Sequence, residues 1–171
     1  MKNWSGVVLW LCVYAFAVPA YADLNIIPKF KDVTKDIYRG GRPTSKDLAD
    51  IQKTPGIKTD IDLENIKSQI SSESSTAKEL KLNFYSEPMT AYNAPDDKQV
   101  DRILDLLQNA SLFPIFLHCK HGEDRTGMII GLYRVEVQKW APKEAYKEML
   151  DLGFHPSYTA LDRYFKKRVG L

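Results

Sequence analysis

The sequence has little of what would cross-link a small protein covalently or direct it to nucleic acid. Two cysteines occur among 171 residues, and the 24 basic side chains exceed the 22 acidic ones by only two. This charge balance predicts neither a general nucleic-acid binder nor a strongly charged tail protein. No internal repeat and no long linker interrupts the chain, so we expect a single compact domain.

The one long apolar run lies near the N-terminus and is too short for a membrane-spanning helix. It covers residues 7–18, follows Lys2 and ends before the small-residue pattern AYA at residues 20–22. A spanning helix needs about 20 apolar residues, whereas this arrangement is typical of a cleaved signal peptide. We therefore expect a signal peptide over residues 1–22, a mature domain over residues 23–171 without a membrane span, and export to the periplasm or secretion.

Cleavage at this point would leave a single cysteine. Cys12 would leave with the signal peptide, and Cys119 would remain. One cysteine excludes an internal disulfide, so the thiol is either an inert core residue or a reactive one. It lies in the segment HCKHGEDRTG, residues 118–127, and this segment is where the functional information is concentrated.

Hydrophobic periodicity alternates between strand and helix patterns along the rest of the chain. Strands are expected at 36–44, 57–63, 82–88 and 113–118. Helices are expected at 46–53, capped by Thr44 or Ser45, and then from 97 onward and at 128–140, 142–152 and 158–167. The serine-rich stretch 68–76 is predicted to be an exposed loop that leads into a short helix at 76–80. This order predicts an α/β fold, a single domain with a central, mostly parallel sheet flanked by helices.

The segment HCKHGEDRTG joins a predicted buried strand to a predicted helix, and this position favours an anion-binding loop. Backbone N–H groups of residues 120–125 can turn inward at the helix N-terminus, where the helix dipole also attracts an anion. Gly122 permits the tight turn and Gly127 permits close packing of the helix. Arg125 can grip two phosphate oxygens with parallel donors. The same groups would lower the pKa of a thiol, which predicts that Cys119 is a nucleophile held beneath a phosphate.

This segment resembles the H-C-x5-R-[ST] signature of the cysteine-dependent tyrosine and dual-specificity phosphatases. The matching positions are His118, Cys119, Gly122, Arg125, Thr126 and Gly127. The resemblance is strongest over residues 96–165 and implies a dual-specificity phosphatase fold. It further implies that Cys119 forms a phosphocysteine intermediate, that Arg125 binds the phosphoryl group, that His118 orients the loop and that the Thr126 hydroxyl assists breakdown of the intermediate.

No cofactor is expected, and a metal site is disfavoured. His118, Cys119 and His121 are potential ligands, but a structural zinc site needs a fourth partner. His155 is the only other histidine in the chain. We therefore predict catalysis without a metal.

The resemblance breaks at the general acid that should protonate the leaving oxygen. Its usual place falls near Thr90 or Ala91, where no acid stands. The substitutes are Asp124, Asp96, Asp97 and Glu87. Asp124 is favoured because the order DRT is similar to that of myotubularin-type lipid phosphatases, in which an acid at this position has been proposed as the proton donor. A role in bracing the loop stays open for Asp124, while Asp96 and Asp97 also suit helix caps and Glu87 a surface position.

Basic residues in the loop suggest the substrate class. Lys120 and His121 would suit several phosphates, and the resemblance of these basic loop residues to those of phosphoinositide and phytase-like phosphatases implies inositol polyphosphates or phosphoinositides. Arg39 and Arg42 are either part of a basic rim or ordinary solvated charges of a turn. The predicted substrate-binding residues are Lys120, His121, Gly122, Glu123 and Gly127. The alternatives are a protein phosphotyrosine or dual-specificity phosphatase and a catalytically silent phosphate-binding module. The expected partner is a phosphorylated small molecule, a lipid headgroup or a phosphoprotein, and the protein is expected to be a monomer.

Overall fold

A computed structural model describes residues 27 to 171, and the predicted signal peptide lies outside this range. The described chain forms one five-stranded sheet with the order β1-β2-β5-β3-β4. All neighbouring strands are parallel except the short edge strand β1. The strands are β1 Lys31–Asp32, β2 Ile37–Gly40, β3 Thr59–Asp62, β4 Asn83–Ser86 and β5 Ile115–His118. The predicted α/β class and the mostly parallel sheet are confirmed.

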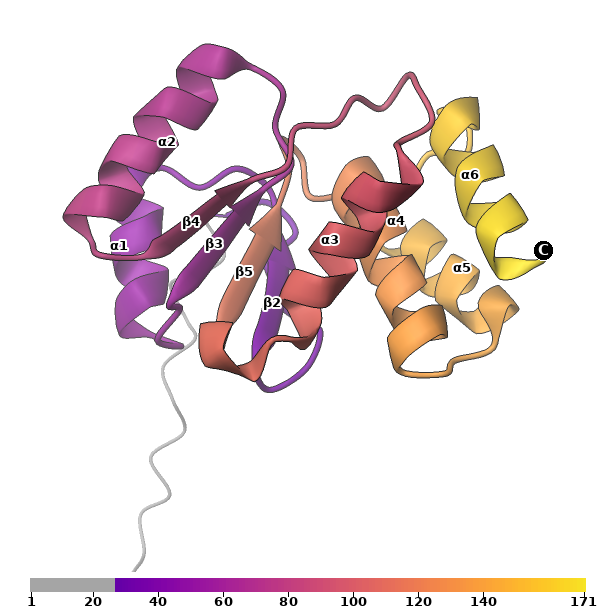
Figure 1. Cartoon of the computed structure of the whole chain (residues 1–171), viewed down its shortest axis with the longest axis horizontal. Coiled ribbons are helices and arrows are strands. Elements are labelled where there is room, and N and C mark those ends of the chain that lie inside the picture. Colours follow the sequence, from indigo (N-terminus) through magenta and orange to yellow (C-terminus); the bar gives the residue numbers. More distant parts are fainter. Residues whose placement is uncertain (1–26) are drawn as a thin grey trace, which may run out of the picture.

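Helices cover both faces of the sheet (Figure 1). The first two, α1 and α2, lie on one face, and the helices α3 to α6 lie on the other. The α-helices are α1 Ser45–Lys53, α2 Lys67–Glu79, α3 Asp97–Gln108, α4 Asp124–Leu132, α5 Pro142–Asp151 and α6 Thr159–Val169. A short 3-10 helix covers Ala110–Leu112, and a π-helical segment covers Tyr133–Val137. Within residues 27–171, no helix is both long enough and apolar enough to cross a bilayer.

Side chains of the central strand point alternately into the two layers of the core. Ile115 and Leu117 face the larger apolar cluster beneath α3 to α6, whereas Phe116 faces the smaller one beneath α1 and α2. This alternation is the normal consequence of the two-residue period of a strand. Because apolar clusters lie on both faces of the sheet, every residue of β5 is buried. His118, which follows Leu117, lies on the α2 side of the sheet, like Phe116.

The expected serine-rich loop is wrong, because this segment belongs to a helix of 13 residues, α2. The hydroxyl of Ser75 donates to the carbonyl of Ser71 at 2.9 Å, and Thr76 donates to Ser72 at 3.2 Å. Serine and threonine can satisfy their hydroxyls in this way inside a helix when tertiary contacts favour it. The contacts come from Glu73 and Ala77, four residues apart on one helix face, which are both buried.

The helix after the phosphatase-like segment also begins earlier than expected, at Asp124 rather than Met128. Seven consecutive residues from Thr126 to Leu132 are buried, so the helix has almost no polar face from which a period can be read. The early start has a functional consequence. The N–H groups of the first turn lie directly beside Cys119, as an anion-binding loop requires.

Helix α3 provides the test of the core. Leu107 is fully buried beneath this helix, whereas its neighbour Leu106 is only partly buried. Leu107→Ala should reduce the free energy of unfolding by about 2–5 kcal/mol, the usual cost of truncating a buried leucine. Urea denaturation followed by circular dichroism would measure it. Leu106→Ala is the matched control and should cost clearly less; equal losses would contradict the orientation of α3.

Candidate active site

The predicted anion-binding loop lies between β5 and α4, at the carboxyl end of the central strand. Strands β2 and β3 flank β5 in parallel, so their carboxyl ends meet at the same edge of the sheet. This edge is where ligands bind in open parallel sheets. A pocket of about 170 Å³ opens there, lined by Asn65, Thr90, Ala91, Tyr92, Cys119, Lys120, His121, Asp124, Arg125 and Tyr158.

Cys119 lies at the base of this pocket and is only 2 % exposed. Burial by itself raises the pKa of the thiol, but the Arg125 guanidinium and polar groups of Thr126 and His121 outweigh it, so the pKa lies below its ordinary value. These polar groups are the hydroxyl and backbone N–H of Thr126 and the backbone N–H of His121; Oγ1 of Thr126 makes no hydrogen bond of normal geometry within residues 27–171. This environment favours a thiolate, the reactive form of cysteine.

Arg125 is held in place by backbone carbonyls and by a buried carboxylate. Its Nη1 donates to the carbonyls of Leu63 at 3.3 Å and Met89 at 3.2 Å. Its Nη2 lies 3.6 Å from Oε1 of Glu64, which is 1 % exposed. Glu64 also accepts hydrogen bonds from Nε of Arg42, at 2.9 Å, and from Nη2 of Arg42. Arg42 therefore neutralises the carboxylate that positions Arg125, a role that the expected basic rim did not anticipate.

The turn of the loop depends on a glycine. Gly122 has a φ of +75°, and a Cβ there would lie 2.5 Å from the carbonyl carbon of Gly40. Both the backbone conformation and the close approach of β2 therefore require glycine. From the same strand, Arg39 donates from Nη2 to the carbonyl of Gly122 at 2.6 Å. Arg39 is 2 % exposed, so its predicted place on a basic rim is wrong.

The side chain of His118 faces away from the pocket, into a buried polar cluster under α2. Its Nε2 lies 2.6 Å from Oε1 of Glu73 and 3.2 Å from Oδ1 of Asp60. Burial lowers the pKa of the imidazole, but Asp60 and Glu73 outweigh it and raise the pKa well above 6.5. The imidazolium thus fixes the end of β5 to β3 and α2, and the predicted role of His118 in orienting the loop stays a prediction.

Two groups of side chains place potential metal ligands close together. Asp60, Glu73 and His118 form one group, and Glu123, Asp124 and His155 form the other. In the first group, the 2.6 Å separation of His118 and Glu73 is a hydrogen-bond distance. Two ligands that each lie about 2.0–2.2 Å from a tetrahedral metal would be farther apart. The first group is therefore described by its ion pairs, and Nε2 of His118, Oε1 of Glu73 and Oδ1 of Asp60 make no hydrogen bond of normal geometry within residues 27–171.

The structure brings most of the predicted site residues together. Lys120, His121 and Asp124 line the pocket with Cys119 and Arg125. Gly122 and Gly127 contribute backbone at the turn and at the start of α4. Glu123 does not line the pocket; its carboxylate pairs with Lys29 at 3.4 Å. The prediction that Glu123 binds substrate therefore has no support from its position.

Of the four candidate general acids, Asp124 alone lines the pocket that contains Cys119. Its Oδ1 accepts a hydrogen bond from the backbone N–H of His155 at 2.8 Å and lies 3.0 Å from the Nδ1 of that ring. Glu87 binds Arg102 with two hydrogen bonds, at 3.2 and 3.1 Å. Glu87 is thus engaged at the surface.

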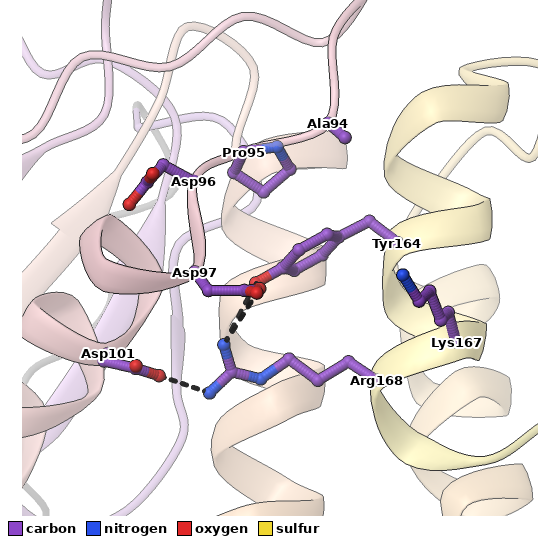
Figure 2. Close-up of a pocket in the computed structure, with 8 residues that line it drawn as sticks. All are labelled: Ala94, Pro95, Asp96, Asp97, Asp101, Tyr164, Lys167 and Arg168. Atoms are coloured by element: carbon purple, nitrogen blue, oxygen red, sulfur yellow. Dashed lines mark hydrogen bonds and ion pairs between the residues drawn. The ribbon is translucent and has the colours of Figure 1, made fainter.

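The upstream aspartates line another pocket, between the start of α3 and helix α6 (Figure 2). Asp96 caps α3 by accepting from the backbone N–H of Gln99, as expected for an N-cap. Asp97 accepts from the hydroxyl of Tyr164 at 2.7 Å and faces Arg168 at 3.8 Å. Their positions match the alternative reading of both residues as helix-end acids.

Sequence reasoning missed two aromatic residues at the mouth of the site. Tyr92 and Tyr158 line the pocket, and their rings meet edge to face with centroids 5.6 Å apart. Tyr92 is 77 % exposed, which is unusual for a large apolar side chain. No sequence signal connects them, because 65 residues separate them and neither belongs to a periodic pattern.

Comparisons with known proteins agree with this geometry. The family model described as "DSP-PTPase phosphatase fused to NAD+ Kinase" matches residues 16–162. The dual specificity protein phosphatase TpbA of Pseudomonas aeruginosa is 43 % identical over 60 residues, which are 34 % of this chain and 28 % of that protein. The inositol diphosphatase SIW14 of Saccharomyces cerevisiae is 26 % identical over 148 residues, 82 % of this chain and 51 % of that protein. The chain therefore spans about half or less of the length of these relatives.

Solved structures show the same fold. The crystal structure of Pseudomonas aeruginosa TpbA has a TM-score of 0.70 and 25 % identity, over 84 % of this chain and 86 % of that one. The core catalytic domain of the Saccharomyces cerevisiae phosphatase SIW14 has a TM-score of 0.67 and 19 % identity, over 84 % and 89 % of the two chains.

The polar cluster under α2 should make stability depend on pH through Asp62. Burial raises the pKa of Asp62 to about 6, against an ordinary value of 3.8. Between these values the folded state binds more protons than the unfolded state, so stability falls as the pH rises from about 4 to about 6, by roughly 3 kcal/mol. Asp62→Asn removes this titration. The asparagine keeps an oxygen that can accept the hydrogen bond from the backbone N–H of Glu64, which in the wild-type protein goes to Oδ1 of Asp62 at 2.6 Å. Urea denaturation between pH 4 and 7 should show a flatter profile.

Asp50→Asn is the control for this experiment. Asp50 lies partly exposed on the surface of α1, and the hydrogen bond from Lys46 lowers the pKa of its carboxyl. The contribution of Asp50 to the free energy of unfolding changes with pH in the opposite direction, because it is fully present above the ordinary pKa of the carboxyl and is lost as the pH falls. The Asp50 variant should keep the decline between pH 4 and 6. A decline of unchanged size in the Asp62 variant would contradict the assignment.

Proposed function

Because this chain belongs to the family of DSP-PTPase phosphatases, we propose that it hydrolyses phosphomonoesters through a cysteine nucleophile. The observation that carries the proposal is the joint placement of Cys119 and Arg125 in one pocket, with a thiol pKa below its ordinary value. A thiolate beneath a phosphate, with a guanidinium beside it, is the arrangement that in-line attack on phosphorus requires. The same activation of the thiol disfavours a silent phosphate-binding module.

In the proposed reaction, the sulfur of Cys119 attacks phosphorus while the bond from phosphorus to the ester oxygen breaks. The leaving oxygen takes a proton from a general acid, and the product is an alcohol or phenol together with a phosphocysteine. Arg125 and the inward N–H groups of the loop stabilise the charge on the phosphoryl oxygens throughout. Water then hydrolyses the S–P bond and releases inorganic phosphate, and the Thr126 hydroxyl stabilises the departing thiolate.

Cys119→Ser tests the nucleophile. The variant should lose turnover of an aryl phosphate, because a serine hydroxyl in this loop is not ionised at neutral pH, and it should still bind inorganic phosphate, because the loop amides and Arg125 are unchanged. Arg125→Ala should lose phosphate binding as well as rate. Phosphate release and isothermal titration calorimetry would measure the two effects, with EDTA present throughout. Turnover by the serine variant, or loss of wild-type activity on chelation, would reject the mechanism.

For the substrate, we propose a polyphosphorylated molecule, either an inositol polyphosphate or a phosphoinositide. Lys120 and His121 line the pocket beside Cys119 and can contact additional phosphates. The relative SIW14 is described as an inositol diphosphatase, which supports this choice. We also propose that the protein is exported after cleavage of residues 1–22 and acts as a monomer.

A second candidate, phosphotyrosine, is favoured by the aromatic pair at the pocket mouth. Tyr92 and Tyr158 offer ring surfaces on which a phenyl group can pack. The relative TpbA is described as a dual specificity protein phosphatase, and one structure of it contains phosphotyrosine. Comparison of kcat/KM for inositol polyphosphates, phosphoinositides and phosphotyrosine peptides separates the two candidates.

We propose Asp124 as the proton donor to the leaving oxygen. Asp124→Asn should slow hydrolysis of an alkyl phosphate by roughly 10²–10⁴-fold, the usual contribution of general acid catalysis. An aryl phosphate with a good leaving group should be affected much less, because its oxygen departs without protonation. The basic limb of the pH–rate profile for the alkyl substrate should disappear.

Asp96→Asn is the matched control for this test, since it removes a helix-cap carboxylate outside the pocket and should change neither rate substantially. Equal slowing of alkyl and aryl substrates by Asp124→Asn would show that Asp124 braces the loop through His155. The donor would then have to come from another group.

A further inference from the structure

A buried arginine without a carboxylate partner lies behind the phosphate-binding loop. Arg39 is 2 % exposed, and of its guanidinium nitrogens only Nη2 has a partner, the carbonyl of Gly122 at 2.6 Å. Nε and Nη1 are buried and have no hydrogen-bond partner among residues 27–171. Burial lowers the pKa of the guanidinium to about 10, so Arg39 is still a cation at neutral pH.

The acids nearest to Arg39 are engaged by other cations. Glu148 on α5 accepts two hydrogen bonds from Arg134, at 2.9 and 2.8 Å, and Glu123 pairs with Lys29. Over the described part of the chain, no carboxylate oxygen lies within ion-pair distance of Arg39. The groups whose charges act on it are Glu148, Cys119, Arg134 and Glu123. An uncompensated buried cation is costly. Cys119 is the remaining anionic group of this set, and its charge partner inside the pocket is Arg125.

The contact with Gly122 fixes the direction of a peptide group in the loop. The C=O and N–H of one planar trans peptide point in opposite directions. A carbonyl of Gly122 that is held outward by Arg39 therefore turns the N–H of Glu123 toward the inner, anion-binding side. A cation on the carbonyl also polarises the peptide, which strengthens the N–H as a donor.

The glycines around Arg39 fit this role. Gly40, the last residue of β2, and the following Gly41 lie so close to the loop that a Cβ on Gly122 would be 2.5–2.7 Å from their backbone atoms. A Cβ on Gly127 would lie 3.7 Å from Nη2 of Arg39. Strand β2 thus brings the guanidinium of Arg39 to the side of the loop that faces away from the pocket, between the turn at Gly122 and the start of α4.

We propose that Arg39 is a positioning residue of the phosphatase site, which orients the peptide between Gly122 and Glu123 and stabilises the Cys119 thiolate with its buried charge. The inference rests on the proposed function, because it assigns Arg39 to the same anion site. Arg39 touches neither the substrate nor the reacting atoms. It acts through the backbone of the loop and through its electrostatic field.

Arg39→Gln and Arg39→Lys separate the two parts of this role. The glutamine keeps a donor but removes the charge, whereas the lysine keeps the charge but removes the planar fork. The rate of alkylation of Cys119 by iodoacetamide, measured from pH 4 to 9, reports the thiol pKa. Arg39→Gln should shift this profile to higher pH and slow alkylation at pH 6 by roughly tenfold or more, the scale of one lost charge-assisted contact. Arg39→Lys should restore most of the profile.

Binding of inorganic phosphate provides the second readout and needs no turnover. In the Cys119→Ser background, Arg39→Gln should weaken phosphate binding by roughly tenfold. Arg168→Met is the matched control, because it removes a partly buried arginine that contacts Glu136, Tyr164 and Asp101 but neither the loop nor the acids near Arg39. It should lower stability without moving the alkylation profile.

Unchanged alkylation and phosphate binding in both Arg39 variants would overturn the proposal and leave Arg39 a residue that only stabilises the fold. If the glutamine variant does not fold, phosphate binding by Arg39→Lys in the Cys119→Ser background decides the orienting role, because loss of the planar fork should weaken binding and unchanged binding would overturn that role. Failure of the proposed function gives a different result, because a wild-type protein that hydrolyses no phosphomonoester would still show whether the thiol pKa depends on Arg39.

Discussion

The lowering of the pKa of a buried thiol, that of Cys119, is the constraint on which the rest of this structure depends. Cys119 is almost fully enclosed, and burial alone would keep its thiol protonated. The thiolate is favoured only because Arg125, the Thr126 hydroxyl and loop N–H groups converge on it. Each of these donors has to be held in one direction, since a buried donor that turns away leaves both itself and the sulfur unsatisfied.

The donors around Cys119 are held in place by charged groups that are themselves buried. Glu64 lies between Arg42 and Arg125, and Arg39 supports the turn at Gly122. On the other face of the sheet, His118 is fixed between Asp60 and Glu73. Buried ion pairs contribute little to net stability, because their desolvation offsets their attraction. Their concentration around one loop therefore indicates that they serve the geometry of the site rather than the stability of the fold.

The fold makes this arrangement possible through the parallel sheet. Strands β2, β3 and β5 end at one edge, so that segments near residues 40, 63 and 119 meet although they are far apart in the sequence. Each strand contributes a different function there. Strand β2 carries Arg39, which supports the loop. Glu64 follows β3, and the nucleophile Cys119 follows β5. The aromatic pair Tyr92 and Tyr158 is added by loops at the same edge and lines the pocket beside Cys119.

The sequence by itself determined the class of the fold, the order of strands and helices along the chain apart from the edge strand β1, and the loop from His118 to Gly127, because periodicity and a dense local motif record properties of neighbouring residues. It also narrowed the general acid to four candidates, of which the tertiary structure places only Asp124 in the pocket with Cys119. Local patterns were misleading where tertiary contacts outweighed them: the serines of α2 form a helix because Glu73 and Ala77 pack on the sheet, and Arg39 is buried although it precedes a glycine turn. The partners of Arg125, Arg39 and His118 were decided by the tertiary structure alone, because an ion pair between distant segments leaves no periodic signal in either one.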